Sequence, residues 1–199
     1  MIATALGFIF SPTAQWNKVA AMSDEKLRIY LLYPAILGII PALAWYYGTT
    51  STGWTVGTDD PVFLTTASAI KIAILFYLTE IFAIWTIGFF IHWMAGTYNA
   101  ASTLVKGVTI AGFTSTPFLI GGIVGFFPIL WLDLLVALLA ITQSVYLLYK
   151  GIPIVMKIPA EQGFLFASAM IAVGMVILIC IMCATVILWD MGFAPMFTD

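Results

Sequence analysis

Residues 164–189 read FLFASAMIAVGMVILICIMCATVILW and contain no charged side chain. An α-helix needs about 20 apolar residues to cross the hydrocarbon layer of a bilayer. Only helices and closed barrels cross that layer, because lipid offers the backbone no hydrogen-bond partner. This stretch therefore predicts a transmembrane helix, and the rest of the chain can be compared with it.

Four more stretches of similar character precede it, and the five together make up more than half of the chain. We expect an all-α integral membrane protein, a bundle of five transmembrane helices, with one membrane domain covering residues 29–199. The expected spans are residues 29–47, 62–95, 108–127, 129–149 and 164–189. The second is longer than a perpendicular span needs, so we expect it to tilt or to run past the bilayer at one end.

Composition excludes several classes of function. Hydrophobic residues make up 63% of the chain and charged residues 8%, too few to cover a soluble globule. The sequence has no zinc-protease, serine-hydrolase or phosphate-loop motif and no basic patch for nucleic acid. With one histidine and no carboxylate cluster, we expect no enzyme, no cofactor and no nucleic-acid partner. The lipid bilayer is the expected surrounding.

The charged residues predict how the chain threads the membrane. Six basic residues fall in three regions that share one side: Lys18, Lys26, Arg28, Lys106, Lys150 and Lys157. The opposite side holds Asp59, Asp60, Asp190 and Asp199. Because basic loops stay in the cytoplasm, we expect the N-terminus to be cytoplasmic and the C-terminus to lie outside.

Residues 1–28 are expected to form a cytoplasmic segment before the first span. Phe8 and Trp16, with several basic residues, are typical of a short helix on the membrane surface whose aromatic rings lie among the headgroups. A disordered tail is the alternative. A cleaved secretory signal fits poorly, because no positive charge precedes the apolar run and Ser11-Pro12 interrupts it.

Glu80 is the charged residue least able to reach an interface, since apolar residues surround it in the second span. A carboxylate in hydrocarbon costs several kcal/mol unless it is protonated, paired or hydrated, so we expect it to face the bundle interior or a wet cavity. It is interpreted either as a functional carboxylate or as a protonated structural carboxyl bonded to a neighbouring helix. The candidate partners are Thr114, Thr116, Thr142 and Gln143.

Lys71 and Asp133 are predicted to lie at similar depths near the outer side. A salt bridge between them would lower the cost of burying both charges, and we favour such a structural pair. The alternative for Lys71 is that its side chain extends alone to the headgroups.

Three residues are weak candidates for metal ligands. Cys180 and Cys183 share one helix face, and sulfur ligands suit monovalent copper. A redox C-x-x-C normally begins a helix in water, so we favour two packing cysteines and expect no metal. His92, beside Trp93 at the cytoplasmic end of the second span, is interpreted as an interface residue rather than a metal or proton site.

Small residues and prolines mark helix contacts and bends. The motifs Gly121-x-x-x-Gly125 and Ser168-x-x-x-Ala172 allow close approach of another helix, within the bundle or in a second copy. Pro117 removes a helix hydrogen bond near Thr116, and neighbouring hydroxyls can bond the freed carbonyls. This predicts a kink or hinge in the third span, and the first span contains the same signal in Pro34 and Pro41.

Short motifs along the whole chain match one known family in order and spacing. They are Phe10-Ser11-Pro12 with Trp16, Ile40-Pro41-Ala42, Gly48-Thr49-Thr50, Gly53-Trp54, Ala111-Gly112-Phe113, Thr116-Pro117, Tyr146 to Pro153, and Val186 to Trp189. The chain resembles the Yip family of Ypt/Rab-interacting membrane proteins, in particular its bacterial YohC-like inner-membrane branch. The resemblance implies a five-span bundle in the inner membrane with a cytoplasmic N-terminus. Eukaryotic members resemble trafficking factors that bind small GTPases and other membrane proteins.

Two functions follow as hypotheses. The first is a non-enzymatic scaffold that binds other membrane proteins, or itself, through lateral helix contacts and through residues 98–106 and 150–162. The second is a small transporter or channel for an ion, a proton-coupled solute or a lipid, with Glu80 as its carboxylate and Pro117 as its hinge. Its polar partners would be Thr79, Thr114 and Thr116. We favour the scaffold, because the spans contain few polar groups and show no inverted repeat.

Overall fold

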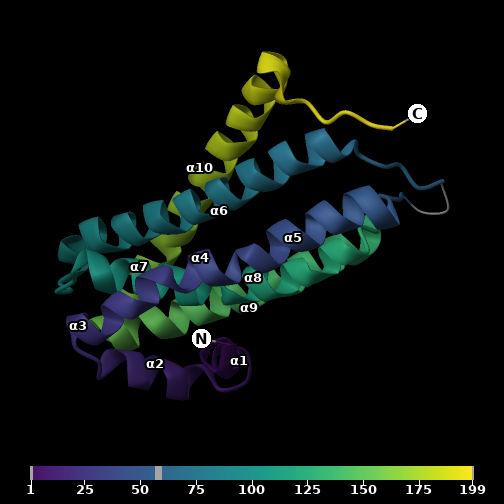
Figure 1. The fold of residues 1–199 in the computed structure, drawn as a ribbon. Coiled ribbons are helices and arrows are strands. Elements are labelled where there is room, and N and C mark those ends of the chain that lie inside the picture. The colour runs from purple at the N-terminus through teal and green to yellow at the C-terminus, as the bar shows by residue number, and fades with distance from the viewer. Residues whose placement is uncertain (1, 57–59, 199) are drawn as a thin grey trace.

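A computed structural model describes residues 2–56 and 60–198, and all regular elements in these ranges are helices (Figure 1). Three isolated bridges join loop residues. The α-helices are α1 (Ile2–Phe10), α2 (Pro12–Ala20), α3 (Asp24–Leu27), α4 (Tyr33–Leu37), α5 (Ile39–Tyr47), α6 (Thr66–Met94), α7 (Leu104–Thr114), α8 (Thr116–Gly121), α9 (Leu130–Met156) and α10 (Ala160–Leu188). Short 3-10 or π turns extend them: η1 (Arg28–Leu32), η2 (Gly48–Thr52), η3 (Ala95–Tyr98), η4 (Gly122–Phe126) and η5 (Trp189–Phe193).

Within the described residues, four continuous helical stretches are long and apolar enough to cross a membrane. They are Asp24–Thr52, Thr66–Tyr98, Leu130–Met156 and Ala160–Phe193. A fifth span exists if Leu104–Thr114 and Thr116–Phe126, which meet at an angle of 40°, are counted together. The expected all-helical membrane fold is therefore confirmed, with a count of four or five spans.

The helix ends differ from the expected span boundaries. The second helix begins at Thr66 rather than near residue 62, because the Thr65 hydroxyl caps it by accepting a hydrogen bond from the Ser68 amide at 3.4 Å. The fourth continues to Met156, where Lys157 adopts a left-handed conformation. Hydropathy marks only the part of a helix within hydrocarbon, whereas the helix itself runs on to a cap. Asp59 and Asp199, used above to predict orientation, lie outside the described residues.

The first and third spans lie side by side and run in the same direction. A methyl group added at Gly112 would contact Pro34 at 3.4 Å, and one added at Gly125 would meet Trp45 at 2.8 Å. Trp45 follows Pro34 in the first span and Gly125 follows Gly112 in the third, so the two spans are parallel. In the ribbon view, α8 lies beside α5 (Figure 1).

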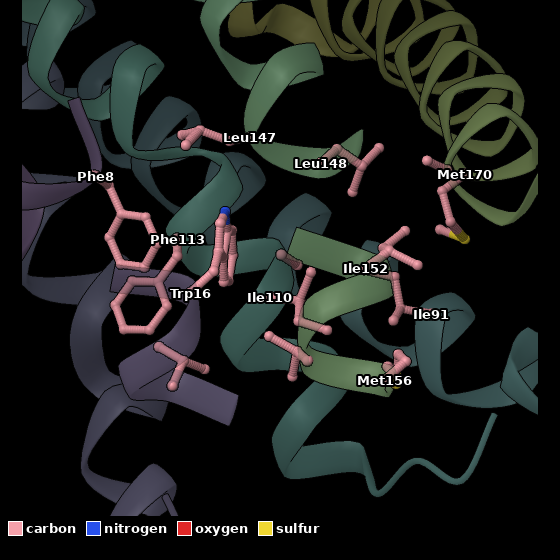
Figure 2. Packing of buried hydrophobic residues seen from close by; sticks show 14 of the residues in the cluster. Phe8, Trp16, Ile91, Ile110, Phe113, Leu147, Leu148, Ile152, Met156 and Met170 are labelled. Carbon is pink, nitrogen blue, oxygen red and sulfur yellow. The ribbon is translucent and has the colours of Figure 1, made fainter. Parts of the chain in front are cut away.

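The N-terminal helices α1 and α2 pack into the bundle. Phe8 and Trp16 are fully buried, and their rings lie 4.7 Å apart between centroids. Phe113 of α7 stacks on Phe8 at 4.5 Å, and these three rings form one group in the core (Figure 2). The expected placement of these aromatic side chains among lipid headgroups is therefore wrong for Phe8 and Trp16. Gly151 of α9 provides the room, since a methyl group there would lie 2.6 Å from the Trp16 ring.

Helix α10 leaves the bundle halfway along its length. Its first half packs against α9 and α6, with Phe166, Ala167 and Met170 buried. No residue from Ile171 to Leu188 is buried, and this half stands apart from the other helices (Figure 1). The chain then returns to the loop before α6, where the Thr65 amide donates to the Met196 carbonyl at 2.9 Å.

Candidate functional site

The Glu80 side chain reaches from α6 to the first span. A methyl group built on Gly38 would overlap its carboxyl oxygen Oε1, so the oxygen rests directly against this glycine. Oε1 is buried and has no hydrogen-bond partner. A buried polar atom without a partner is uncommon in native structures, and such a group is often functional or bonded to water. Glu80 and Gly38 are therefore the starting point of the site.

The first span is interrupted where Glu80 meets it. Gly38 lies between α4 and α5, and its amide donates to the Pro34 carbonyl at 2.8 Å. Pro41 has no amide hydrogen to give to the Leu37 carbonyl one turn earlier, so the regular helix bonding is broken there. A glycine next to such a break leaves space for a side chain from a neighbouring helix.

Tyr77 holds α6 against the same interruption. Its hydroxyl donates to the Ala35 carbonyl at 2.9 Å. Tyr77 and Glu80 are three residues apart in a helix and therefore share one face. The polar face of α6 thus meets the first span through one satisfied hydroxyl and one unsatisfied carboxyl oxygen.

The third span is interrupted beside the first. Helices α7 and α8 meet at Ser115, two residues before Pro117, with the 40° bend described above. Ser115 bonds back to the Ala111 carbonyl through its hydroxyl at 2.9 Å, as expected for a hydroxyl near a proline break. The kink expected at the middle of this span is therefore present.

A buried hydrogen bond joins the two interrupted spans. The Tyr33 and Thr116 hydroxyl oxygens lie 2.7 Å apart, and both side chains are fully buried. Thr114, one residue before the break, has a buried hydroxyl without a partner. The site is thus a set of polar groups along the two broken spans: the Glu80 carboxyl against Gly38, the Tyr33–Thr116 pair and the Thr114 hydroxyl, with no hydrogen bond from Glu80 Oε1 to the hydroxyls. Such a set can hold a proton or a small cation; it offers no nucleophile with an adjacent base.

None of the four residues expected to bond to Glu80 does so: three have other hydrogen-bond partners and one has none. Thr116 bonds to Tyr33, the Thr142 hydroxyl donates to the Leu138 carbonyl, and the Gln143 amide lies 3.5 Å from the Ile9 carbonyl. The Thr114 hydroxyl has no partner. The structural interpretation with these four residues is therefore wrong, because Glu80 faces the first span rather than the third or fourth. Thr79 of the transport hypothesis precedes Glu80 on α6 and is half-buried.

Lys71 and Asp133 do not form the expected pair. Within residues 2–56 and 60–198 the one ion pair joins Lys106 and Asp24, at 3.9 Å. Both carboxyl oxygens of Asp133 are buried without a partner, and the Lys71 side chain is exposed. The reason is that Lys71 lies on α6, which is not among the helices that pack against α9. Asp133 lies in the first turn of α9, whose partly positive end accommodates a carboxylate, and α9 packs against α2, α7, α8 and α10.

Three of the four predicted packing residues contact other helices of this chain, and the fourth is exposed. Gly121 faces Val136 of α9, and Gly125 faces Trp45 of the first span, so both meet helices of this chain. The Ser168 hydroxyl bonds to Tyr149 at 2.8 Å, whereas Ala172 is exposed.

The three weak candidates for metal ligands do not come together in the described part of the chain. Cys180 and Cys183 are free and exposed on the half of α10 that leaves the bundle. His92 has a buried Nδ1 atom without a partner at the end of α6. Among the residues that the structure describes, no three His, Cys, Asp or Glu side chains come together as metal ligands would.

Three residues of the site, Gly38, Tyr77 and Tyr33, were not predicted from the sequence. Gly38 gave a signal, since it lies between two prolines in the first span. Tyr77 gave a weaker one, as a polar side chain one helical turn before Glu80. Tyr33 resembled any aromatic residue at a membrane interface, and its bond to Thr116 depends on how two distant helices pack.

The bundle described above defines a multi-span membrane protein whose interior carries the Glu80 carboxyl and several hydroxyl groups. Its family follows from comparison with known proteins. The Yip1 domain family matches residues 6–181, and the chain belongs to this family.

Two curated relatives agree with that assignment. The inner membrane protein YohC of Escherichia coli strain K12 is 33% identical over 187 residues, which are 94% of this chain and 96% of the relative. The protein of the same name from Escherichia coli O6:H1 strain CFT073 matches to the same extent. No solved structure matches the chain. The expected resemblance is confirmed, and the chain is a Yip-family protein of the inner membrane.

Proposed function

We propose that this protein is a non-enzymatic scaffold that binds other membrane proteins through the free half of α10, residues 171–188. The observation that carries the proposal is that this half has no buried residue, although the first half of the same helix is packed into the bundle. Membrane helices associate through close packing and small side chains. An apolar helix that is exposed over most of its circumference can bind a partner helix without disturbing the rest of the fold.

Small residues on this half support the proposal. A methyl group added at Gly174 would contact nothing within 4 Å, so this glycine is unused within the chain. Cys180, Cys183 and Ala184 are also small and exposed. Together they give a partner helix several places of close approach. Residues 98–106 and 150–162 remain the proposed cytoplasmic contacts.

The proposal includes an orientation, with the N-terminus in the cytoplasm and the C-terminus outside. It rests on the distribution of basic residues. The ion pair between Lys106 and Asp24 supports it, because it joins the N-terminal segment to the start of the third span at one end of the bundle.

Photo-crosslinking in native membranes tests the partner-binding surface. A benzophenone amino acid is placed at Met182, which is 62% exposed on the free half, and in a control variant at Leu138, which is 61% exposed on α9. We expect irradiation to give a discrete adduct of defined mass from position 182 and only lipid adducts from position 138. Equal patterns at the two positions, or lipid adducts alone at both, would exclude α10 as a specific protein-binding surface.

A second candidate function is transport of a proton or small cation, favoured by the unpaired Glu80 oxygen beside the interruption of the first span. Transporters often place their ion sites at such interruptions, near the middle of the membrane. In this case Glu80 must be reached by water during the cycle.

Thiol labelling tests that requirement. In a protein whose Cys180 and Cys183 are replaced by alanine, Glu80→Cys is exposed to a membrane-impermeant maleimide in cells and in everted vesicles. Leu78→Cys is the control, because Leu78 is 56% exposed on the lipid side of the same helix and should stay unlabelled. Labelling at position 80 alone would favour transport and justify a flux assay with Glu80→Gln. No labelling at either position would leave the scaffold as the function.

A further inference from the structure

An apolar crevice lies between the first span and α6. Its volume is about 280 Å³. Trp45, Tyr46 and Thr49 form one wall. The other wall belongs to α6, where Ala69 and Ala73 are small residues one helical turn apart, and this leaves the space open. The Thr49 hydroxyl is turned away from the crevice and bonds to the Trp45 carbonyl at 2.7 Å, so the wall is apolar even at its hydroxyl residue.

Hydrogen bonds flank the crevice along α6. At one end the C-terminal tail covers the start of α6, since the Met196 amide donates to the Ser68 hydroxyl at 3.0 Å and Leu64 pairs with Phe197. Toward the other end, Phe76 is the last lining residue on α6, and the next residue, Tyr77, donates its hydroxyl to the Ala35 carbonyl at 2.9 Å. Phe76 on the wall is 41% exposed, so the crevice is open on this side of α6, which borders the membrane.

We propose that this crevice binds an acyl chain of a phospholipid from the bilayer. The chain enters through the open side of the crevice and packs between Trp45 and Ala73. Water is a poor occupant, because a bound water needs two to four polar partners and the walls offer none. An apolar chain gains dispersion contacts with both helices, as it does in any well-packed apolar site.

The chemistry of the walls also excludes a free fatty acid as the preferred ligand. No charged side chain lines the crevice. Lys71 is the nearest basic residue along α6, but it lies two positions from both Ala69 and Ala73 and therefore on the opposite face of the helix. A free carboxylate would have no cationic partner, whereas a phospholipid keeps its headgroup at the membrane surface and inserts only its chain.

Photolabelling of the purified full-length protein in lipid nanodiscs tests the proposal. The nanodiscs contain a phosphatidylglycerol with a diazirine in the middle of one acyl chain, and adducts are mapped by peptide mass spectrometry. We expect adducts at Trp45 and at Ala69, which is only 2% exposed, at a yield at least equal to that at the lipid-facing Leu138. Ala73→Phe fills the crevice and should lower the Trp45 yield several-fold. Ala184→Phe, on the free half of α10, should leave it unchanged.

The labelling pattern of the unmodified protein decides the matter even if Ala73→Phe does not fold. Adducts confined to exposed residues such as Leu138 and Leu78 would overturn the proposal. A diazirine fatty acid is tested in parallel at the same concentration. Stronger labelling of Trp45 by the fatty acid than by the phospholipid would overturn the assignment of the ligand.

Discussion

The hydroxyl oxygens of Tyr33 and Thr116 lie 2.7 Å apart and are sealed from the surface, so that this bond ties the first span to the third at the point where both are interrupted. An interruption leaves backbone groups unsatisfied and a helix easier to bend. A bond between two interruptions fixes their relative position. The following predictions test this bond and the contacts around it.

Tyr33→Phe removes one hydroxyl of this pair and leaves Thr116 buried without a partner. We expect a loss of about 1 kcal/mol in stability, as for other hydrogen bonds between membrane helices. Thr116→Val should cost a similar amount, and the double variant should cost less than the sum. Unfolding of the purified protein in detergent measures all three. Additive losses would show that the two hydroxyls do not interact.

Gly38→Ala places a methyl group on the Glu80 carboxyl oxygen. Overpacking of this kind costs about 1–3 kcal/mol, and we expect a lower unfolding temperature in detergent. Glu80→Ala removes the obstacle and should restore part of the loss. Recovery should be incomplete, because the Pro34 carbonyl oxygen would also lie 2.9 Å from the new methyl group. A loss that Glu80→Ala leaves unchanged would contradict the contact.

Gly151→Ala forces a methyl group against the Trp16 ring, 2.6 Å away. We expect helices α1 and α2 to separate from the bundle and the segment around residue 21 to become sensitive to trypsin. Gly96→Ala is the matched control, since a methyl group there meets nothing within 4 Å. Limited proteolysis followed by mass spectrometry compares the two variants. Equal cleavage would mean that Trp16 does not depend on Gly151.

The proposed orientation predicts which loops a membrane-impermeant thiol reagent can reach. With Cys180 and Cys183 replaced by alanine, Ala101→Cys should be labelled only in everted vesicles. Met191→Cys should be labelled only in intact cells, because it follows the last span. Labelling of both positions from the same side would mean an even number of spans, with the bent pair of α7 and α8 as a re-entrant segment.

The sequence was sufficient for the parts of the fold that depend on one helix at a time. Each apolar run is long enough to reveal its helix, and Pro117 indicates a bend within two residues of the one observed at Ser115. Amphipathic segments were harder to interpret. Phe8 and Trp16 would look the same in sequence whether they faced headgroups or other helices, and the difference depends on Phe113 and Gly151, more than 90 residues later.

The candidate site was predictable only in its central residue. Glu80 stands out because a charge among apolar residues is costly. Its contact with Gly38 is a matter of how two helices rotate and slide against each other, and no local pattern records this. The same holds for Lys71 and Asp133, whose similar predicted depth says nothing about the directions in which their side chains point.

The burial of Trp16 against Gly151 has a consequence for biosynthesis. At about 5–20 residues per second, a ribosome needs roughly 7–27 s to travel from Trp16 to Gly151. During that interval α1 and α2 have been made but their binding site has not, and their aromatic side chains remain accessible to the insertion machinery or to the lipid surface. The earliest part of this protein to emerge is thus among the last to reach its final place.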